Sequence, residues 1–268
     1  MYQTDESSRK SLALPSPLSG VRLVSSKAAV VELAKELILL FGAYGIYLIV
    51  RNLVVPTAQT TAFLNAERLI DFEKTLHIYW EPGWQRWAFD HAEWSLDFSN
   101  WFYMFGYMPI ILTTATMVYL FDRDRYKRYR SVILVSLFLA LIVFSAFPLA
   151  PPRFEDTRSG MVDILAMNGS IISKPGSESF YNQYAAMPSL HFGWALLISI
   201  LFLTSRHWFW KLCGVIYPVA MLFTIVLTAN HYILDAVGGV GIIALSYLLY
   251  RALFPDRARL LRLLRLRP

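Results

Sequence analysis

Apolar runs of about twenty residues recur along this chain, separated by polar breaks. A helix of ~20 residues spans the ~30 Å hydrocarbon core of a bilayer and satisfies its own backbone hydrogen bonds there. The composition agrees, because 56% of the 268 residues are hydrophobic and 16% are charged. The sequence therefore predicts an all-α fold, a polytopic membrane helix bundle that forms one domain over residues 27–254.

Six transmembrane helices are predicted, together with interfacial amphipathic helices. The spans lie near Ala28–Val50, Phe98–Phe121, Ser131–Phe147, from the His191 region to Thr204, after Lys211, and from His231 to about Phe254. Residues 1–26 are polar and are predicted to form a mobile cytoplasmic tail. Residues 255–268 alternate arginine with leucine, which predicts a basic amphipathic cytoplasmic tail that contacts anionic membrane lipids.

Two longer polar segments lie between the spans. Residues 51–97 contain apolar side chains such as Leu69 and Phe72 that alternate with charged ones such as Glu73, followed by several tryptophans. This pattern predicts an interfacial outer segment with an amphipathic helix. An anchor in the membrane interface is the favoured interpretation, and a cap that admits lipid from the side is the alternative. Residues 148–187 are rich in proline, glycine and serine and are predicted to form an outer loop.

The distribution of basic residues predicts the orientation in the membrane. The short inner segments carry 17 of the 25 Lys and Arg residues, and the longer outer segments carry 7. The positive-inside rule then places both termini in the cytoplasm of a multi-pass cell-membrane protein. Because the cations lie in breaks between spans, the net charge of +6 does not indicate a nucleic-acid partner. The single cysteine, Cys213, excludes an intrachain disulfide.

Two short polar motifs flank a pair of the predicted spans. The first contains Ser189 and His191, and the second contains His231 and Asp235. The two spans between these motifs cross the membrane in opposite directions. Both histidines therefore lie on the same side of the membrane. His231 and Asp235 are four positions apart, so on a helix the carboxylate could hold one imidazole nitrogen and leave the other free to attack. Free amides near Ser189 at a helix start would attract an anion. This chemistry suits phosphoryl transfer.

The motifs resemble those of the type 2 phosphatidic-acid phosphatase superfamily. Pro188-Ser189-x-His191 is similar to its Pro-Ser-Gly-His motif, and His231-x-x-x-Asp235 to the end of its second motif. Leu190 in place of glycine is most like the branch of the inositol phosphorylceramide synthases, which are inositol phosphotransferases. The resemblance implies His231 as the nucleophile, Asp235 as its orienter and His191 as the acid toward the leaving group.

One phosphate-binding position of the family departs from its pattern. The arginine that the family has six residues before the second histidine falls at Ile225, which cannot bind phosphate. Arg153, directly after Ala150-Pro151-Pro152, is the predicted substitute, with Ser189 as the other phosphate-binding residue.

The expected function is cleavage of a lipid phosphoester through a phosphohistidine. The substrate would be a phospholipid or a polyprenyl or other lipid phosphate, and the acceptor either water or an alcohol such as inositol. No cofactor and no metal is expected, although two histidines and a carboxylate leave a zinc site as an alternative. The same residues are also compatible with purely structural histidines, and the fold with an inactive transporter or scaffold. The active site would face the outer, non-cytoplasmic side.

Overall fold

A computed structural model describes residues 26–167 and 182–254 of the chain. These residues form an all-helical bundle, which confirms the predicted fold class. The long helices are α1 (Ser26–Thr75), α2 (Glu81–His91), α3 (Glu93–Phe105), α4 (Met108–Phe121), α5 (Arg123–Ala146), α8 (Leu190–Leu203), α9 (Trp208–Leu227) and α10 (Ile233–Leu253). Three short turns, η1 (Pro152–Phe154), α6 (Asp156–Ser159) and α7 (Ile164–Met167), lie between α5 and α8. The two predicted tails and part of the predicted outer loop lie outside the described residues.

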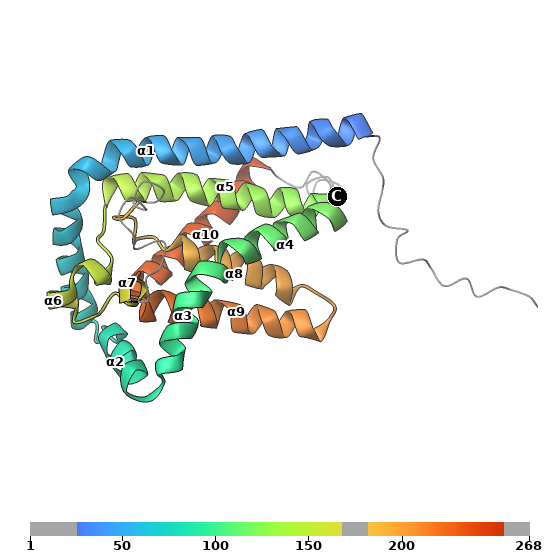
Figure 1. The fold of residues 1–268 in the computed structure, drawn as a ribbon. Helices are drawn as coiled ribbons and strands as arrows, with labels where there is room; N and C mark the ends of the chain where they lie inside the picture. The colour runs from blue at the N-terminus through green and yellow to red at the C-terminus, as the bar shows by residue number, and fades with distance from the viewer. Residues whose placement is uncertain (1–25, 168–181, 255–268) are drawn as a thin grey trace, which may run out of the picture.

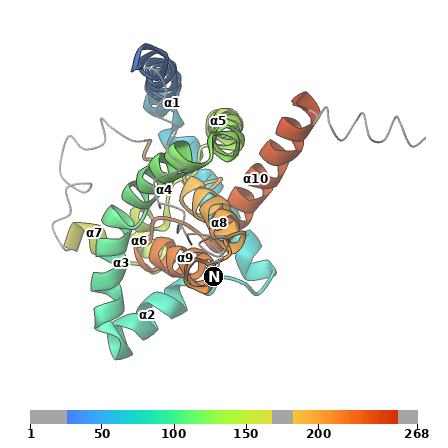
Figure 2. The same cartoon turned by 90° about the vertical axis from the view of Figure 1, so that its right-hand side faces the viewer.

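The centre of the bundle is α8, which lies between α5 and α9 in both views (Figures 1 and 2). It packs most extensively against α9 and also contacts α10, α4 and α5. Among the described residues, four helices are long and apolar enough to cross a membrane, in α1, α5, α9 and α10. The helix pair α3 and α4 makes a fifth span if it is counted as one, and α8 is a shorter apolar helix of 14 residues.

The predicted second span is broken in the structure. Helix α3 ends at Phe105 and α4 begins at Met108, and the two axes meet at 45°. Gly106 occupies the break because a side chain there would overlap the ring of Phe102. Pro109 lies in the first turn of α4, where its missing N–H leaves no helical acceptor unsatisfied. The break places Tyr107 inside the bundle instead of on a continuous helix surface.

Helix α1 continues far beyond the predicted first span. It extends through Thr75 and changes direction along its length, as Figure 1 shows. One face of its second half is buried against the segments around residues 149–150 and 184–186; the buried residues are Ala58, Ala62, Ala66, Leu69 and Ile70. Glu73, predicted on the polar face, is fully buried, whereas Phe72 is exposed. The packed face therefore includes Leu69 and Ile70 of the predicted apolar face, but small alanines and Glu73 complete it in place of Phe72.

The basic residues that follow α4 start helix α5 instead of forming a loop. Helix α5 begins at Arg123, and the Asp122 side chain caps it by accepting from the Arg125 amide at 2.9 Å. Arg123 reaches Glu32 at 3.4 Å, and Arg125 donates to Thr204 at 3.4 Å. These contacts gather the starts of α1 and α5 and the α8–α9 turn at one end of the bundle (Figure 1).

Candidate active site

The turn between α9 and α10 presents His231. Helix α9 ends at Leu227, and Ala229 adopts a left-handed conformation with φ of 54°. Such a residue ends a helix by returning later amides to its last carbonyls, a position usually held by glycine. Here the amides of Asn230 and His231 both donate to the Ile225 carbonyl at 3.1 Å. Ile225, at the position of the family's missing arginine, is therefore a buried core residue whose backbone holds the histidine in place.

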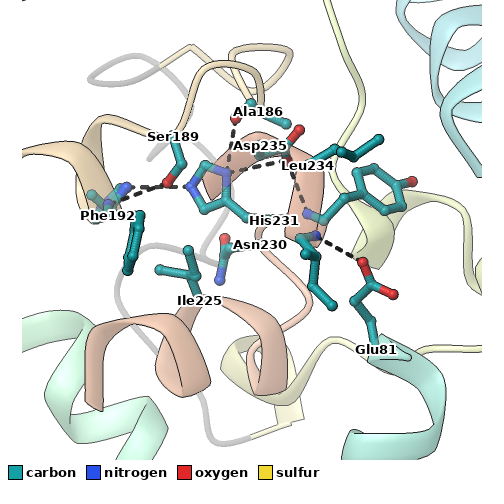
Figure 3. Close-up of polar contacts among 12 residues, drawn as sticks. Glu81, Ala186, Ser189, Phe192, Ile225, Asn230, His231, Leu234 and Asp235 are labelled. Atoms are coloured by element: carbon teal, nitrogen blue, oxygen red, sulfur yellow. Dashed lines mark hydrogen bonds and ion pairs between the residues drawn. The ribbon is translucent and has the colours of Figure 1, made fainter. Parts of the chain in front are cut away.

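One ring nitrogen of His231 contacts both a main-chain carbonyl and a carboxylate (Figure 3). Its Nδ1 is 2.9 Å from the Ala186 carbonyl oxygen and 3.4 Å from Asp235 Oδ2. A carbonyl oxygen only accepts, so Nδ1 carries the proton and donates it. The lone pair of the neutral imidazole is then on Nε2, the nitrogen that an attack on an electrophile needs.

Asp235 belongs to the first turn of α10, but His231 precedes that helix. Tyr232 is the N-cap, and its amide donates to Asp235 Oδ2 at 2.9 Å. The carboxylate oxygen therefore serves the helix start and the imidazole together. The predicted meeting of His231 and Asp235 occurs through this turn, not through a shared helical face.

His191 stands at the start of α8, opposite His231. Ser189 caps this helix, and its hydroxyl accepts from the Phe192 amide at 3.3 Å. His191 is the second residue of the helix, and its Nδ1 lies 3.4 Å from His231 Nε2. The Ser189 amide donates to the Asp235 carbonyl at 2.9 Å, so it is not one of the free amides predicted there. Leu190 and His191 begin α8, and a first turn offers amides that have no acceptor within the helix.

A backbone-to-backbone crossing joins the two helices that carry these residues. A side chain at Gly239 in α10 would overlap the Ser189 carbonyl oxygen, and one at Gly193 in α8 would lie 3.0 Å from the Gly239 carbonyl. Glycine at both positions lets α8 and α10 approach closely, which fixes the spacing between the Ser189–His191 segment and Asp235.

Arg153 extends from η1 to the same turn. Its amide donates to the Ala229 carbonyl at 2.9 Å, and its guanidinium bonds the side-chain oxygen of Asn230. Asp163 lies 3.8 Å from its Nε. The side chain is 8% exposed, and its charge acts on both histidines. The predicted substitute for the phosphate-binding arginine is thus brought to the site, beside an asparagine that sequence reasoning did not select.

Burial sets the charge state of His231. Removal from water, and then the nearby charge of Arg153, lower the pKa of its imidazole to about 3, against the bond to Ala186 that raises it. The ring is therefore neutral over the physiological range. A neutral imidazole retains the lone pair that nucleophilic attack requires.

The two histidines open onto a cavity of about 840 Å³. Its polar end is lined by Arg153, Asn182, Gln183, His191, Asn230 and His231. Its walls are apolar side chains of α1, α4, α5 and α8, among them Leu40, Phe41, Ile111, Ala115, Leu134 and Ile198. The rings of Tyr103 and Tyr107 lie 4.8 and 4.1 Å from that of His191, between centroids, and also line the cavity. A charged group at one end and an apolar chain along the walls would both be accommodated.

The structure brings together His191, His231, Asp235 and Arg153, and it places Ser189 beneath them as a helix cap. Sequence reasoning missed the carbonyl of Ala186, since a backbone group carries no residue signature. Among the described residues, no group of three or more His, Cys, Asp or Glu side chains could hold a metal ion.

Comparisons with known proteins agree with the two motifs. The model of the PAP2 superfamily matches residues 67–249. The inositol phosphorylceramide synthase catalytic subunit aur1 of Schizosaccharomyces pombe is 29% identical over 112 residues, covering 37% of this chain and 26% of that protein. The match therefore spans about a quarter of this relative's length. No solved structure matches significantly. The family match extends over both histidine motifs and more than half of the sequence, so this chain belongs to the PAP2 superfamily.

Proposed function

We propose that this protein is an integral-membrane lipid phosphoesterase or phosphotransferase that works through a phosphohistidine on His231. The observation that carries the proposal is the bond from His231 Nδ1 to the Ala186 carbonyl, which leaves the lone pair on Nε2, 3.4 Å from His191 Nδ1 in a pair of rings that both line the cavity. Nε2 attacks phosphorus, a P–N bond forms, and the P–O bond to the leaving group breaks. His191 gives its proton to the departing oxygen.

The second half of the reaction reverses these roles. An acceptor hydroxyl loses its proton to His191 while its oxygen attacks phosphorus, and the P–N bond breaks to release His231. Arg153 and the amides that begin α8 stabilise the charge on the phosphoryl oxygens in both halves. Asn230 positions Arg153 through their side-chain contact.

A lipid substrate follows from the shape and lining of the cavity. Its walls are largely apolar, and the two histidines lie together with Arg153 and Asn230 at one end, so a phosphate headgroup and an acyl or prenyl chain fit together. The substrate class is a phospholipid or a polyprenyl or other lipid phosphate.

Two acceptors are compatible with this site. Water gives a lipid phosphate phosphatase, and an alcohol such as inositol gives a phosphotransferase. The similarity to an inositol phosphorylceramide synthase subunit favours the alcohol, while water needs no second binding site. A transporter or scaffold that keeps the fold without chemistry would not need a neutral, oriented imidazole facing a second histidine.

The test uses the purified protein in nanodiscs with a set of phosphate-labelled lipids, each with and without inositol. We expect labelled phosphate without an alcohol, or a labelled inositol product with it, and neither with His231→Ala. Activity should survive exhaustive chelation and should be inhibited by vanadate, a phosphate mimic. Loss on chelation with recovery on adding one metal would contradict a metal-free mechanism. Equal turnover by wild type and His231→Ala would contradict the proposal itself.

A further inference from the structure

Carboxyl groups from three different helices meet at the start of α10, directly behind His231. Glu81 Oε1 accepts from the Ile233 amide at 2.7 Å, and Glu73 Oε1 accepts from the Leu234 amide at 2.9 Å. Asp235 accepts from the preceding amide, that of Tyr232. Figure 3 shows Glu81 on the side of the helix start away from the Ala186 contact. Each of the first amides of α10 is thus held by a side chain from another part of the chain or by Asp235.

The two glutamates are buried in full. Both have 0% exposure, and the second oxygen of each, Oε2, has no donor among the described residues. The two carboxyl groups accept from consecutive amides of α10 and so lie close together, and the charge of Glu81 acts on Glu73. Two neighbouring buried carboxylates repel each other if both are ionised, whereas a proton on one of them can be donated to the orphaned oxygen of the other.

The surroundings supply further negative charge. The charge that acts on both glutamates, besides each other, is Asp235 of α10. The charges of Glu73 and Glu155 act on Tyr79 and Tyr232, and the Tyr79 hydroxyl donates to the Ser159 carbonyl at 2.8 Å. The ammonium group of Lys74 lies 5.4 Å from the ring centroid of Tyr79.

We propose that Glu73 and Glu81 are positioning residues that share one proton and so hold the first turn of α10, and with it His231, in the geometry for attack. The link runs through the backbone, because residues 233 and 234 immediately follow the His231–Tyr232 segment. This inference rests on the proposed function only for its kinetic consequence, and the sharing of a proton stands apart from it.

Removal of the shared proton should disturb the site. Burial, and then the charge of Glu81, raise the pKa of Glu73 to about 9. Above that pH two buried carboxylates would face each other, and the acceptors of the 233 and 234 amides would separate. A displacement of ~1 Å in a reacting group can lower turnover by about 10²-fold. Because the cavity walls belong to other helices, kcat should fall more than KM changes.

The kinetic experiment compares three substitutions in the full-length protein in nanodiscs. Glu73→Ala removes the acceptor for the Leu234 amide and should lower kcat by about 10²-fold. Glu73→Gln retains an oxygen for that amide and an N–H₂ donor toward Glu81 but has no proton to lose. It should recover most of the kcat lost in Glu73→Ala and lack the fall in kcat near pH 9. Glu67→Gln is the matched control, since Glu67 lies on the same helix in a half-exposed ion pair with Arg158; it should keep the wild-type profile.

A second experiment reads the proton without any turnover. The infrared spectrum of the wild type should contain a protonated-carboxyl band that disappears as the pH is raised through about 9. Glu73→Gln should lose that band, Glu81→Gln should shift the band and its pH dependence, and Glu67→Gln should leave both unchanged. A band and pH dependence unchanged in both Glu73→Gln and Glu81→Gln, or a Glu73→Ala protein with wild-type kcat and alkaline profile, would overturn the inference. If the wild type turned over no phosphoester but showed the band and its loss, the proposed function would fail while the shared proton would stand.

Discussion

The Nδ1 atom of His231 is closer to the carbonyl oxygen of Ala186 than to the carboxylate of Asp235, at 2.9 Å against 3.4 Å. The backbone therefore holds the tautomer of the imidazole, and the carboxylate adds charge and caps α10. In Ser-His-Asp triads, where the aspartate alone sets the tautomer, its replacement by asparagine lowers kcat by about 10⁴-fold.

We therefore expect Asp235→Asn to be milder here. The amide oxygen still accepts from the Tyr232 amide, and Ala186 still accepts from Nδ1. The loss in kcat should be about 10–10²-fold, because only the support for a positive imidazole is removed. Single-turnover kinetics of Asp235→Asn beside His231→Ala would measure it. A loss as complete as that of His231→Ala would show that Asp235, and not Ala186, sets the tautomer.

The two histidines should differ in their response to the leaving group. His231→Ala should abolish turnover for every substrate and leave no covalent phosphoenzyme. General-acid catalysis contributes ~10²–10⁴-fold, and an aryl leaving group needs little of it. His191→Ala should therefore retain cleavage of an aryl phosphate and lose cleavage of an alkyl phosphoester. Rapid-quench labelling would follow both, and covalent label in His231→Ala would identify a different nucleophile.

In the folded protein, His231 should take up a proton only at a pH far below the usual pKa of histidine. The pKa of His231 is lowered from 6.5 to about 3, so the unfolded chain binds this proton at higher pH than the folded one. The contribution of neutral His231 to the free energy of unfolding is therefore fully present above pH 6.5. It is lost as the pH falls toward 3. Thermal unfolding from pH 7 to 4 should show a smaller pH dependence in His231→Gln than in the wild type. An identical dependence in both proteins would contradict the lowered pKa.

The glycine crossing gives a test of spacing. Gly239→Ala would place a methyl group against the Ser189 carbonyl, and overpacking of this kind costs roughly 1–3 kcal/mol. We expect a lower unfolding temperature and strongly reduced turnover. Gly241→Ala is the control two residues along the same helix, because nothing lies within 4 Å of its added methyl group. It should be neutral or stabilising by about 0.5–1 kcal/mol. Equal effects of the two substitutions would remove the basis for close packing as the determinant of the site.

Orientation in the membrane is open to labelling in a Cys213→Ala background. The basic end of the bundle should face the cytoplasm and the histidine end the outside. Asp90→Cys in α2 should react with an impermeant maleimide added to intact cells, and Asp124→Cys in α5 should react only after permeabilisation. Both native side chains are accessible to solvent. The reverse pattern would invert the proposed orientation.

The sequence was sufficient for features that repeat or that follow chemical type. Apolar runs predicted the helical bundle, and the spacing of the two motifs predicted that His191 and His231 would meet. The choice of Arg153 depended on its position after a proline pair, and the structure brings it to the same turn. These signals lie in side chains whose identity is read directly.

Other features depend on backbone groups or on burial that composition conceals. The Ala186 carbonyl has no signature, and the bend at Gly106 is one glycine among 13. Glu73 looked like part of the polar face of an interfacial helix because charged residues are rarely buried in full, and nothing in the sequence around Glu81 indicated its burial. Their burial becomes visible only when the first amides of α10 are seen to need acceptors.

Because α8 and α10 approach closely, the geometry of the site and the shape of the cavity wall depend on different residues. Distances among His191, His231 and Asp235 depend on glycine contacts, helix caps and carbonyl bonds, all of which are independent of the side chains that line the cavity wall. Substitutions along that wall, at residues such as Leu134 or Ile198, can reshape the space for a lipid chain while the reacting atoms stay in register. Under the proposed function, a lineage built on this arrangement can therefore change its lipid substrate without changing its catalytic residues.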